Sequence, residues 1–324
     1  MATRLNGGSG TSVAPALPIS GPRMRRALAL TVPDELDRVA KDAPSVSLVR
    51  HVLARLVLEL LHYEVLIRLR ADPEDVHRAR STVRRLRAVL RGIRPFLDRV
   101  WADNLREELR WFAGELASVR DIDVTLSELR SRAQSIPSDE RPYLESVFDP
   151  LGAAREAARV KLLETLDGSR YIGLMHALEA AATAPRLAAE GVPCAGELGW
   201  RSLSKTSKRV RRAVQGAQES CSPTELHHAR IIVRNGRYVA EACAPVLGKP
   251  ARRLAKRLAT MQEALGAISD ATLIQNRLRA LSVQDRANIL IGQLLTLQAA
   301  EGDRARHDWC TLRRKALREG WLHA

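Results

Sequence analysis

The stretch from Val76 to Pro95 carries a dense run of positive charge. It holds one histidine and seven arginines and no acidic residue. On a helix, with about 100° between successive residues, five of these side chains fall on one face: His77, Arg80, Arg84, Arg87 and Arg91. Like charges three and four residues apart repel one another and weaken a helix by roughly 0.2–0.5 kcal/mol per pair. This pattern therefore predicts a helix whose charge is balanced by a bound polyanion.

The same pattern occurs a second time, 150 residues further along the chain. Residues 72–87 and 222–237 are identical at seven of sixteen positions, and the second copy also places four basic residues on one face: His227, Arg230, Arg234 and Arg237. Each copy begins with a helix N-cap residue followed by proline, Asp72 in the first copy and Ser222 in the second. An internal repeat of this kind predicts two similar structural units in tandem.

A third basic helix is expected to begin near Trp200. Four of its residues share one side: Lys205, Lys208, Arg209 and Arg212. If the two units pack side by side, the three basic faces meet in one groove; three separate solvated faces are the alternative. Arginine suits a groove for phosphate because its charge is permanent and its planar fork grips two oxygens at once. His77 and His227 either donate to phosphate or bond to a backbone carbonyl in a structural role.

The remaining sequence predicts an all-α fold. From about residue 33 apolar residues recur at helical spacing, as in Leu105, Leu109, Phe112 and Leu116, and again in Leu254, Leu258, Met261 and Leu265. Trp111, Tyr171 and Trp200 are expected in the core. The stretch 183–199 is the best candidate for a central linker. We expect a disordered tail over residues 1–27 and a single domain over 28–324, made of two helical-bundle repeats at about 28–182 and 196–324.

The sequence resembles the CHAD family, which is named for its conserved histidine α-helical domain. The resemblance rests on five segments in order: VHRARSTVRRLRAVL (76–90), LREELRWFAGELASVRDIDVTL (105–126), SRYIGLMHAL (169–178), ELHHARIIVRNGRYVAE (225–241) and LAKRLATMQEALGAISD (254–270). It implies two four-helix bundles related by pseudo-twofold symmetry, with a basic groove between them. It also implies non-catalytic binding of inorganic polyphosphate, and in some relatives an association with polyphosphate granules.

The resemblance carries the family's basic positions onto particular residues of this chain. Its two histidines fall on His77 and His227, and its arginines on both repeats; Asn235 departs from the usual basic residue of the second copy. Together with the helical faces, this predicts the following polyphosphate-binding residues: His77, Arg80, Arg84, Arg85, Arg87, Arg91, Lys205, Lys208, Arg212, His227, Arg230, Arg234 and Arg237. Arg120 also matches a family position, and an internal ion pair with an acid is its alternative role.

Other functions are less well supported by the residues. A metal-dependent phosphohydrolase needs converging ligands, but Asp121 and Asp123 lie about 200° apart on a helix, and neither HExxH nor a glycine-rich phosphate loop occurs. We therefore expect no catalytic residue, metal or cofactor. Nucleic acid is the main alternative ligand, as a non-specific competitor for the groove. Only twelve aromatic residues, five Trp, four Tyr and three Phe, are present to stack bases.

The composition gives an expectation for the cellular compartment of the protein. The chain has 324 residues and a net charge of +15, and its four cysteines form no CxxC pair, so reduced thiols are expected. No apolar run approaches the roughly 18 residues of a membrane span, so no membrane insertion is expected. These features favour the cytoplasm, including polyphosphate granules, while KRVRR (208–212) leaves a nuclear location open for a eukaryotic protein. The oligomeric state is not predicted.

Overall fold

The computed structural model describes residues 38–133, 145–189, 194–219, 222–280 and 285–318. The predicted all-α class is confirmed, since this part of the chain contains no β-structure beyond two isolated bridges. The elements in chain order are α2 (Ser45–Leu69), α3 (Pro73–Gly92), a short 3-10 helix (Arg94–Phe96), α4 (Arg99–Ala133), α5 (Glu145–Asp167), α6 (Ser169–Thr183), α7 (Ala195–Glu219), α8 (Pro223–Leu247), α9 (Lys249–Ala280) and α10 (Asp285–Arg318). No helix in the described ranges is both long and apolar enough to cross a lipid bilayer.

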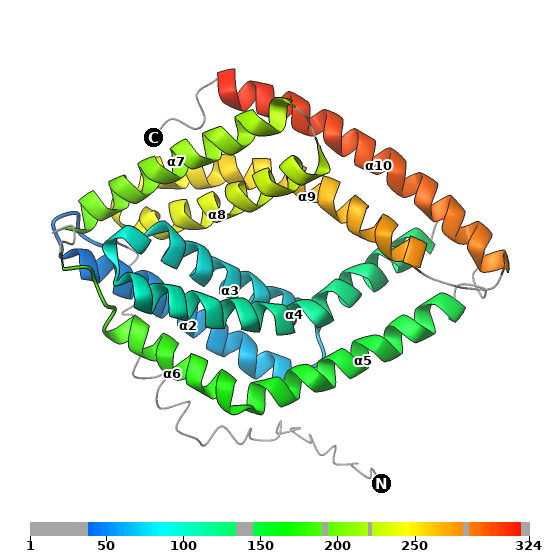
Figure 1. The fold of residues 1–324 in the computed structure, drawn as a ribbon, viewed down its shortest axis with the longest axis horizontal. Helices are drawn as coiled ribbons and strands as arrows, with labels where there is room; N and C mark the ends of the chain where they lie inside the picture. Colours follow the sequence, from blue (N-terminus) through cyan, green and yellow to red (C-terminus); the bar gives the residue numbers. More distant parts are fainter. Residues whose placement is uncertain (1–37, 134–144, 190–193, 220–221, 281–284, 319–324) are drawn as a thin grey trace, which may run out of the picture.

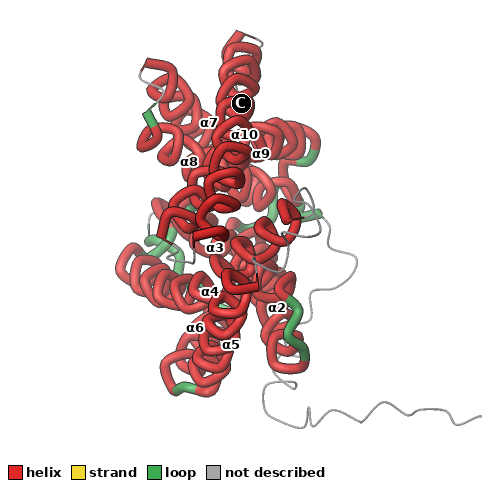
Figure 2. Tube along the Cα trace, turned by 90° about the vertical axis from the view of Figure 1, so that its right-hand side faces the viewer, coloured by secondary structure: helices red, strands yellow, loops and turns green. Residues whose placement is uncertain are grey.

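The helices pack as two groups, as the internal repeat predicts. In the first group α2, α3 and α4 pack together with α5 and α6; in the second, α7, α8, α9 and α10 pack together (Figure 1). The groups meet mainly where α3 lies against α8, with smaller contacts of α2 with α7 and α8 and of α4 with α9. Figure 2 shows the two groups from the side, one above the other. The two repeated basic helices are therefore the central pair of the molecule.

The start signals of both repeated helices act as the sequence predicts. The Asp72 side chain accepts a bond from the Glu74 amide at 2.9 Å, and Ser222 accepts one from the Glu225 amide at 3.2 Å. Such caps each stabilise a helix by about 1 kcal/mol. Asp75 does not complete a capping box; it is buried and receives two bonds from Arg70, at 2.6 and 2.8 Å. The caps fix where α3 and α8 begin, and thereby which way their arginines point.

The predicted apolar faces form the core. The sets on α4 and α9 are all buried, as the spacing predicts. Tyr171 is buried as well, with its hydroxyl donating to Glu64 at 2.9 Å. Trp200 is 41% exposed, so its prediction as a core residue was wrong. The reason is that α7 begins at Ala195, earlier than expected, and the buried face of that helix runs through Leu203, Val210 and Val214, which leaves the indole at its edge.

Two glycines allow the central helices to approach their neighbours closely. A Cβ atom on Gly92 would lie 2.5 Å from a methyl of Val239, and one on Gly236 would lie 2.7 Å from a methyl of Val210. Real Cβ atoms do not pack this tightly, so a larger residue would push α3 from α8 or α8 from α7. This explains why Gly236 stands in the second repeat where Leu86 stands in the first.

Candidate functional site

The centre of the site is a pair of equivalent arginines, Arg84 on α3 and Arg234 on α8. The Nε atom of each is buried and has no hydrogen-bond partner among the described residues. Burial, and next the charge of Arg84, lowers the pKa of Arg234 to about 10. Burial is also the main cause of the lowered pKa of Arg84, to which the charges of Arg80 and Arg230 add. Both guanidinium groups remain charged at neutral pH, so the fold holds cations together that repel one another.

A second equivalent pair, Arg80 and Arg230, flanks the first. Arg80 lies 3.8 Å from Asp121 on α4, and Arg230 donates to Asp270 on α9 at 3.2 Å. The side chains are 26% and 25% exposed, so each arginine keeps donors directed to solvent. Because Asp121 and Asp270 occupy equivalent places in the two repeats, the structure extends the repeat beyond α3 and α8 to the neighbouring helices.

The two predicted histidines occupy different environments. His77 is partly buried on α3, and burial, and next the charge of Arg120, lowers its pKa below the usual value near 6.5. Arg120 also adds to the positive field at Arg84. His227 is exposed on α8, and Ser269 stands where the sequence repeat would place a partner for it equivalent to Arg120. Only the first of the two histidines therefore faces the strong positive field.

The basic stripe continues along α3 toward its C-terminal end. Burial, and then the charges of Arg106 and Arg110 on α4, lowers the pKa of Arg87. Burial, and then Arg209, Arg106 and Arg87, lowers the pKa of Arg91. Sequence reasoning missed Arg106 and Arg110 because acids stand among them. Their position one residue after the core residues Leu105 and Leu109 was the signal that could have found them.

A small recess lies beyond Arg91, where α3, α7 and α8 meet. Its charged lining residues are Arg91, Lys205 and Arg209. The α7 residues that line it are Lys205, Thr206, Arg209 and Val210. Lys208 and Arg212, also predicted to bind, are exposed on α7 and do not line this recess. Of the four basic residues that the sequence placed on one side of α7, Lys205 and Arg209 therefore line the recess, whereas Lys208 and Arg212 do not.

We call this set of neighbouring cations the basic track; some of them also have an acidic partner, such as Arg106, which donates to Asp103 at 2.8 Å. The track runs from the central cluster along α3 to the recess and consists of His77, Arg80, Arg84, Arg87, Arg91, Arg106, Arg110, Arg120, Lys205, Arg209, Arg230 and Arg234. Most of its members were predicted from the sequence.

Comparison with known proteins identifies the family. A family model of the CHAD domain matches residues 51–279, which is more than half of the chain. The chain belongs to the CHAD family. Two solved structures share its fold: PptA from Streptomyces chartreusis, with a TM-score of 0.68 and 21% identity over 84% of this chain and 100% of that one, and the CHAD domain from the plant Ricinus communis, with a TM-score of 0.70 and 22% identity over 89% of this chain and 94% of that one. Among curated proteins, none matches this sequence significantly.

The matched region of this CHAD chain includes both α3 and α8, and with them the whole central cluster. The resemblance seen in the sequence is therefore confirmed, together with the helical fold that it implied.

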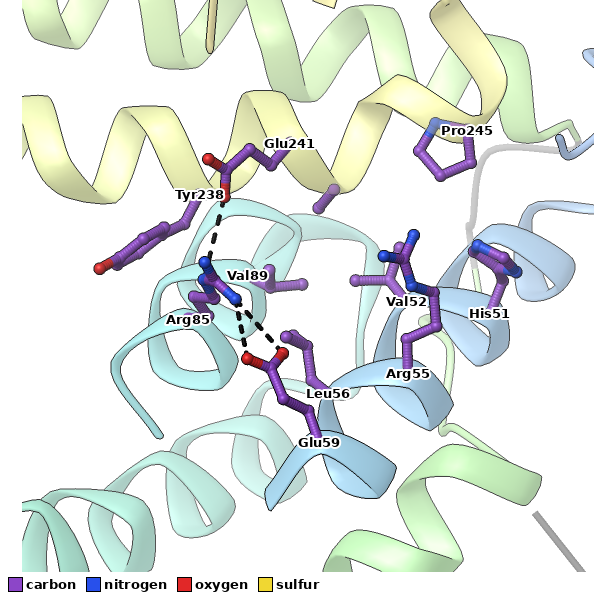
Figure 3. Close-up of a pocket in the computed structure, with 11 residues that line it drawn as sticks. His51, Val52, Arg55, Leu56, Glu59, Arg85, Val89, Tyr238, Glu241 and Pro245 are labelled. Atoms are coloured by element: carbon purple, nitrogen blue, oxygen red, sulfur yellow. Dashed lines mark hydrogen bonds and ion pairs between the residues drawn. The ribbon is translucent and has the colours of Figure 1, made fainter. Parts of the chain in front are cut away.

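Two predicted binding residues, Arg85 and Arg237, are held by carboxylates. Arg85 lines a pocket of about 290 Å³ between α2, α3 and α8, together with Glu59 and Glu241 (Figure 3). Arg85 donates to both carboxylate oxygens of Glu59, at 3.0 and 3.2 Å, and its Nε lies 3.9 Å from Glu241. Arg237 donates to Glu241 at 2.8 Å. Arg85 points away from Arg84 because adjacent residues on a helix diverge by about 100°. Carboxylates thus neutralise both side chains, as the sequence alone did not show.

The acidic residues weighed as metal ligands have other partners in the CHAD domain. Asp121 lies beside Arg80, and Asp123 is buried and receives a bond from Arg155 at 2.5 Å. Within the described residues, no group of three or more His, Cys, Asp and Glu side chains is placed to hold a metal ion.

Proposed function

We propose that this CHAD protein binds inorganic polyphosphate without catalysing its turnover, and that the basic track is the binding surface. The observation that carries the proposal is the central pair: buried Nε donors of Arg84 and Arg234 that lack partners among the described residues. The Nε atoms of Arg87 and Arg106, also in the track, lack a partner in the described part of the chain as well. A buried donor left without a partner costs about 1–3 kcal/mol, so the track would gain from a ligand that accepts these hydrogen bonds.

Repulsion within the track supports an anionic polymer as that ligand. The lowered pKa values of Arg84, Arg87, Arg91 and Arg234 record burial together with like charges nearby. A bound phosphate chain would replace lost water contacts with charge-assisted hydrogen bonds and relieve the repulsion between neighbouring arginines. Arginines spaced along one helix face match a ligand that repeats its charge at short intervals.

Polyphosphate fits this surface better than nucleic acid does. The aromatic residue at the centre, Tyr238, is only 3% exposed and therefore presents no open ring face to a base. Trp111 is covered by the guanidinium of Arg170, at 4.2 Å from its ring centre. Without stacking surfaces, the track would offer nucleic acid only its phosphate contacts, and the sugars and bases would add bulk without gain.

Calorimetric titration with polyphosphate of defined length, with duplex DNA as competitor, tests the proposal. We expect binding without added metal, favouring long chains over pyrophosphate, that duplex DNA displaces poorly at equal phosphate concentration. Efficient displacement by DNA would favour the nucleic-acid function. Release of free phosphate or shortening of the chains on incubation with a divalent metal would contradict the non-catalytic function.

A further inference from the structure

The recess at the end of the basic track has a counterpart elsewhere in the molecule. Its three charged residues, Arg91, Lys205 and Arg209, correspond at the repeat offset of 150 to Glu241, Arg55 and Glu59. These three residues line the larger pocket between α2, α3 and α8. The recess and that pocket are therefore equivalent sites of the two repeats: α3 and α8 exchange roles, and α7 stands in the recess where α2 stands in the pocket.

The two equivalent sites differ in charge. All three charged residues that line the recess are cations. In the pocket two of the equivalent positions are glutamates, Glu59 and Glu241, which lie on either side of Arg85 (Figure 3). Glu241 also accepts a bond from Arg237. Asn235, which also lines the recess, stands at the position equivalent to Arg85. The repeat has thus kept one site positive and made the other nearly neutral.

The recess is continuous with the centre of the track. Arg84 and Arg91 are two helical turns apart on the same face of α3, about 10 Å along the axis, and Arg87 lies between them. Charges on both sides of Arg91 lower its pKa: Arg209 toward the recess, and Arg106 and Arg87 toward the centre. Beyond this point α8 closes against α3 and α7 at Gly92 and Gly236, where no side chain larger than glycine fits.

We propose that the recess binds the terminal phosphate of a linear polyphosphate chain, and that the chain therefore lies on the site in one register, with its end between α3 and α7. This inference rests on the proposed polyphosphate function. A terminal phosphate has one more free oxygen than an internal one and carries up to two charges near neutral pH, as phosphomonoesters do. Two guanidinium forks and an ammonium group suit that extra charge and oxygen.

The opposite end of the ligand has no equivalent site. A terminal phosphate entering the pocket would meet Glu59 and Glu241, which repel it, and arginines that these carboxylates already bind. Displacing a carboxylate from an arginine exchanges one ion pair for another with little gain. The asymmetry of the two sites thus selects which side of the groove receives the chain end.

A matched pair of ligands and a matched pair of variants test the proposal. The ligands are linear oligophosphates of one length, either with free ends or with both terminal phosphates capped as methyl esters, titrated by calorimetry. The wild-type protein should bind the free-ended chain about tenfold more tightly, which corresponds to one lost charged hydrogen bond. Lys205→Gln should abolish most of this preference. Arg55→Gln, which removes the same charge at the equivalent position of the other repeat, should keep it.

The outcomes separate this inference from the proposed function. Equal binding of free and capped chains by the wild-type protein would overturn the terminal subsite while leaving polyphosphate binding intact. Loss of the preference in both variants would overturn it as well, since a general charge effect would then explain the result. Absence of binding of either chain to the wild-type protein would instead reject the proposed function. Circular dichroism melting of both variants checks that they fold, and Arg91→Gln provides a second test within the recess.

Discussion

Arginines at the edge of the molecule and arginines at its centre are treated differently by the fold. At the helix junctions each arginine has an acid: Arg70 binds Asp75, and Arg94 binds Asp103 at 2.5–3.0 Å. At the contact of α3 with α8, Arg84 and Arg234 have no ion pair among the described residues. Acids therefore hold the arginines that join helices, whereas the two arginines at the centre of the basic track have none in the described part of the chain, although Arg80 and Arg230 beside them have Asp121 and Asp270.

This difference teaches that net charge is a poor guide to a binding site. The excess of +15 does not lie evenly over the surface. Paired arginines of the junctions are already satisfied, so they add little to affinity for an anion. Unpaired arginines of the centre are costly to the folded state, and under the proposed function a bound polyphosphate would offset that cost. The comparison separates arginines that serve stability from arginines that serve binding, and each prediction below tests that division.

The largest effect is expected from the central pair. Replacing Arg84 and Arg234 together by glutamine should weaken long-chain polyphosphate binding at least about 100-fold, because two charged hydrogen bonds of roughly 1.5–3 kcal/mol each are lost. The melting temperature should stay the same or rise, since buried repulsion is removed. Replacing Arg70 and Arg94 together by glutamine changes the charge equally and should leave affinity nearly intact. Equal losses in the two double variants, measured by calorimetry, would erase the distinction between centre and edge.

Salt dependence should report the same division. Each arginine that neutralises a phosphate releases counterions, so the logarithm of the binding constant falls linearly with the logarithm of the salt concentration. The slope of that plot should become smaller by about 2 in the central double variant and stay unchanged in the edge double variant. A slope that changes equally in both would mean that the ligand senses only total charge. Fluorescence titration at four or five salt concentrations is sufficient.

The largest effect on stability should come from an arginine of the structural class. Arg155 donates to buried Asp123 at 2.5 Å and to the carbonyl of Ala71 at 2.9 Å. Arg155→Gln should lower the free energy of unfolding by about 2 kcal/mol, because a buried carboxylate loses its charged partner. Polyphosphate affinity should not change. Denaturant titration measures the first quantity, and a loss of affinity in a folded variant would place Arg155 in the binding class instead.

Removing the acid that holds an arginine tests the same division between paired and unpaired arginines. Glu241→Gln releases Arg237 and loosens Arg85, so affinity for long chains should rise roughly two- to fivefold, the gain expected from breaking an exposed ion pair. Glu108→Gln removes an acid that binds Arg170, away from the track, and serves as the control of equal charge. A similar rise in affinity in both variants would show that the loss of one negative charge, and not the release of Arg237, explains the effect.

Much of this division was predictable, and what was missed has physical reasons. Helical spacing and the repeat identified α3, α8 and their arginine faces, because capping residues and apolar periodicity are local signals. The partners of Arg85 were not predictable, since Glu59 lies 26 residues away in the chain and Glu241 in the other repeat. Which of the four basic residues on one side of α7 line the recess was not predictable either, because this depends on where α3 and α8 meet that helix. Which arginine lacks an acid is thus a tertiary property.

The smallest effect expected is a pH dependence through His77. Burial and Arg120 lower its pKa, so the unfolded chain takes up the proton first as pH falls below about 6.5, and the free protein loses stability there. A bound polyanion reverses this, because negative charge raises the pKa of the imidazole. Affinity should therefore increase between pH 7.5 and pH 6 by a factor that is larger in the wild-type protein than in His77→Gln. Titration of the ligand itself cancels in that ratio. His227→Gln, at the exposed equivalent position, should behave like the wild type. If His77→Gln also kept the full wild-type increase, His77 would not sense the groove. The two histidines thus repeat on a small scale the difference between the buried arginines of the basic track and the arginines that face solvent.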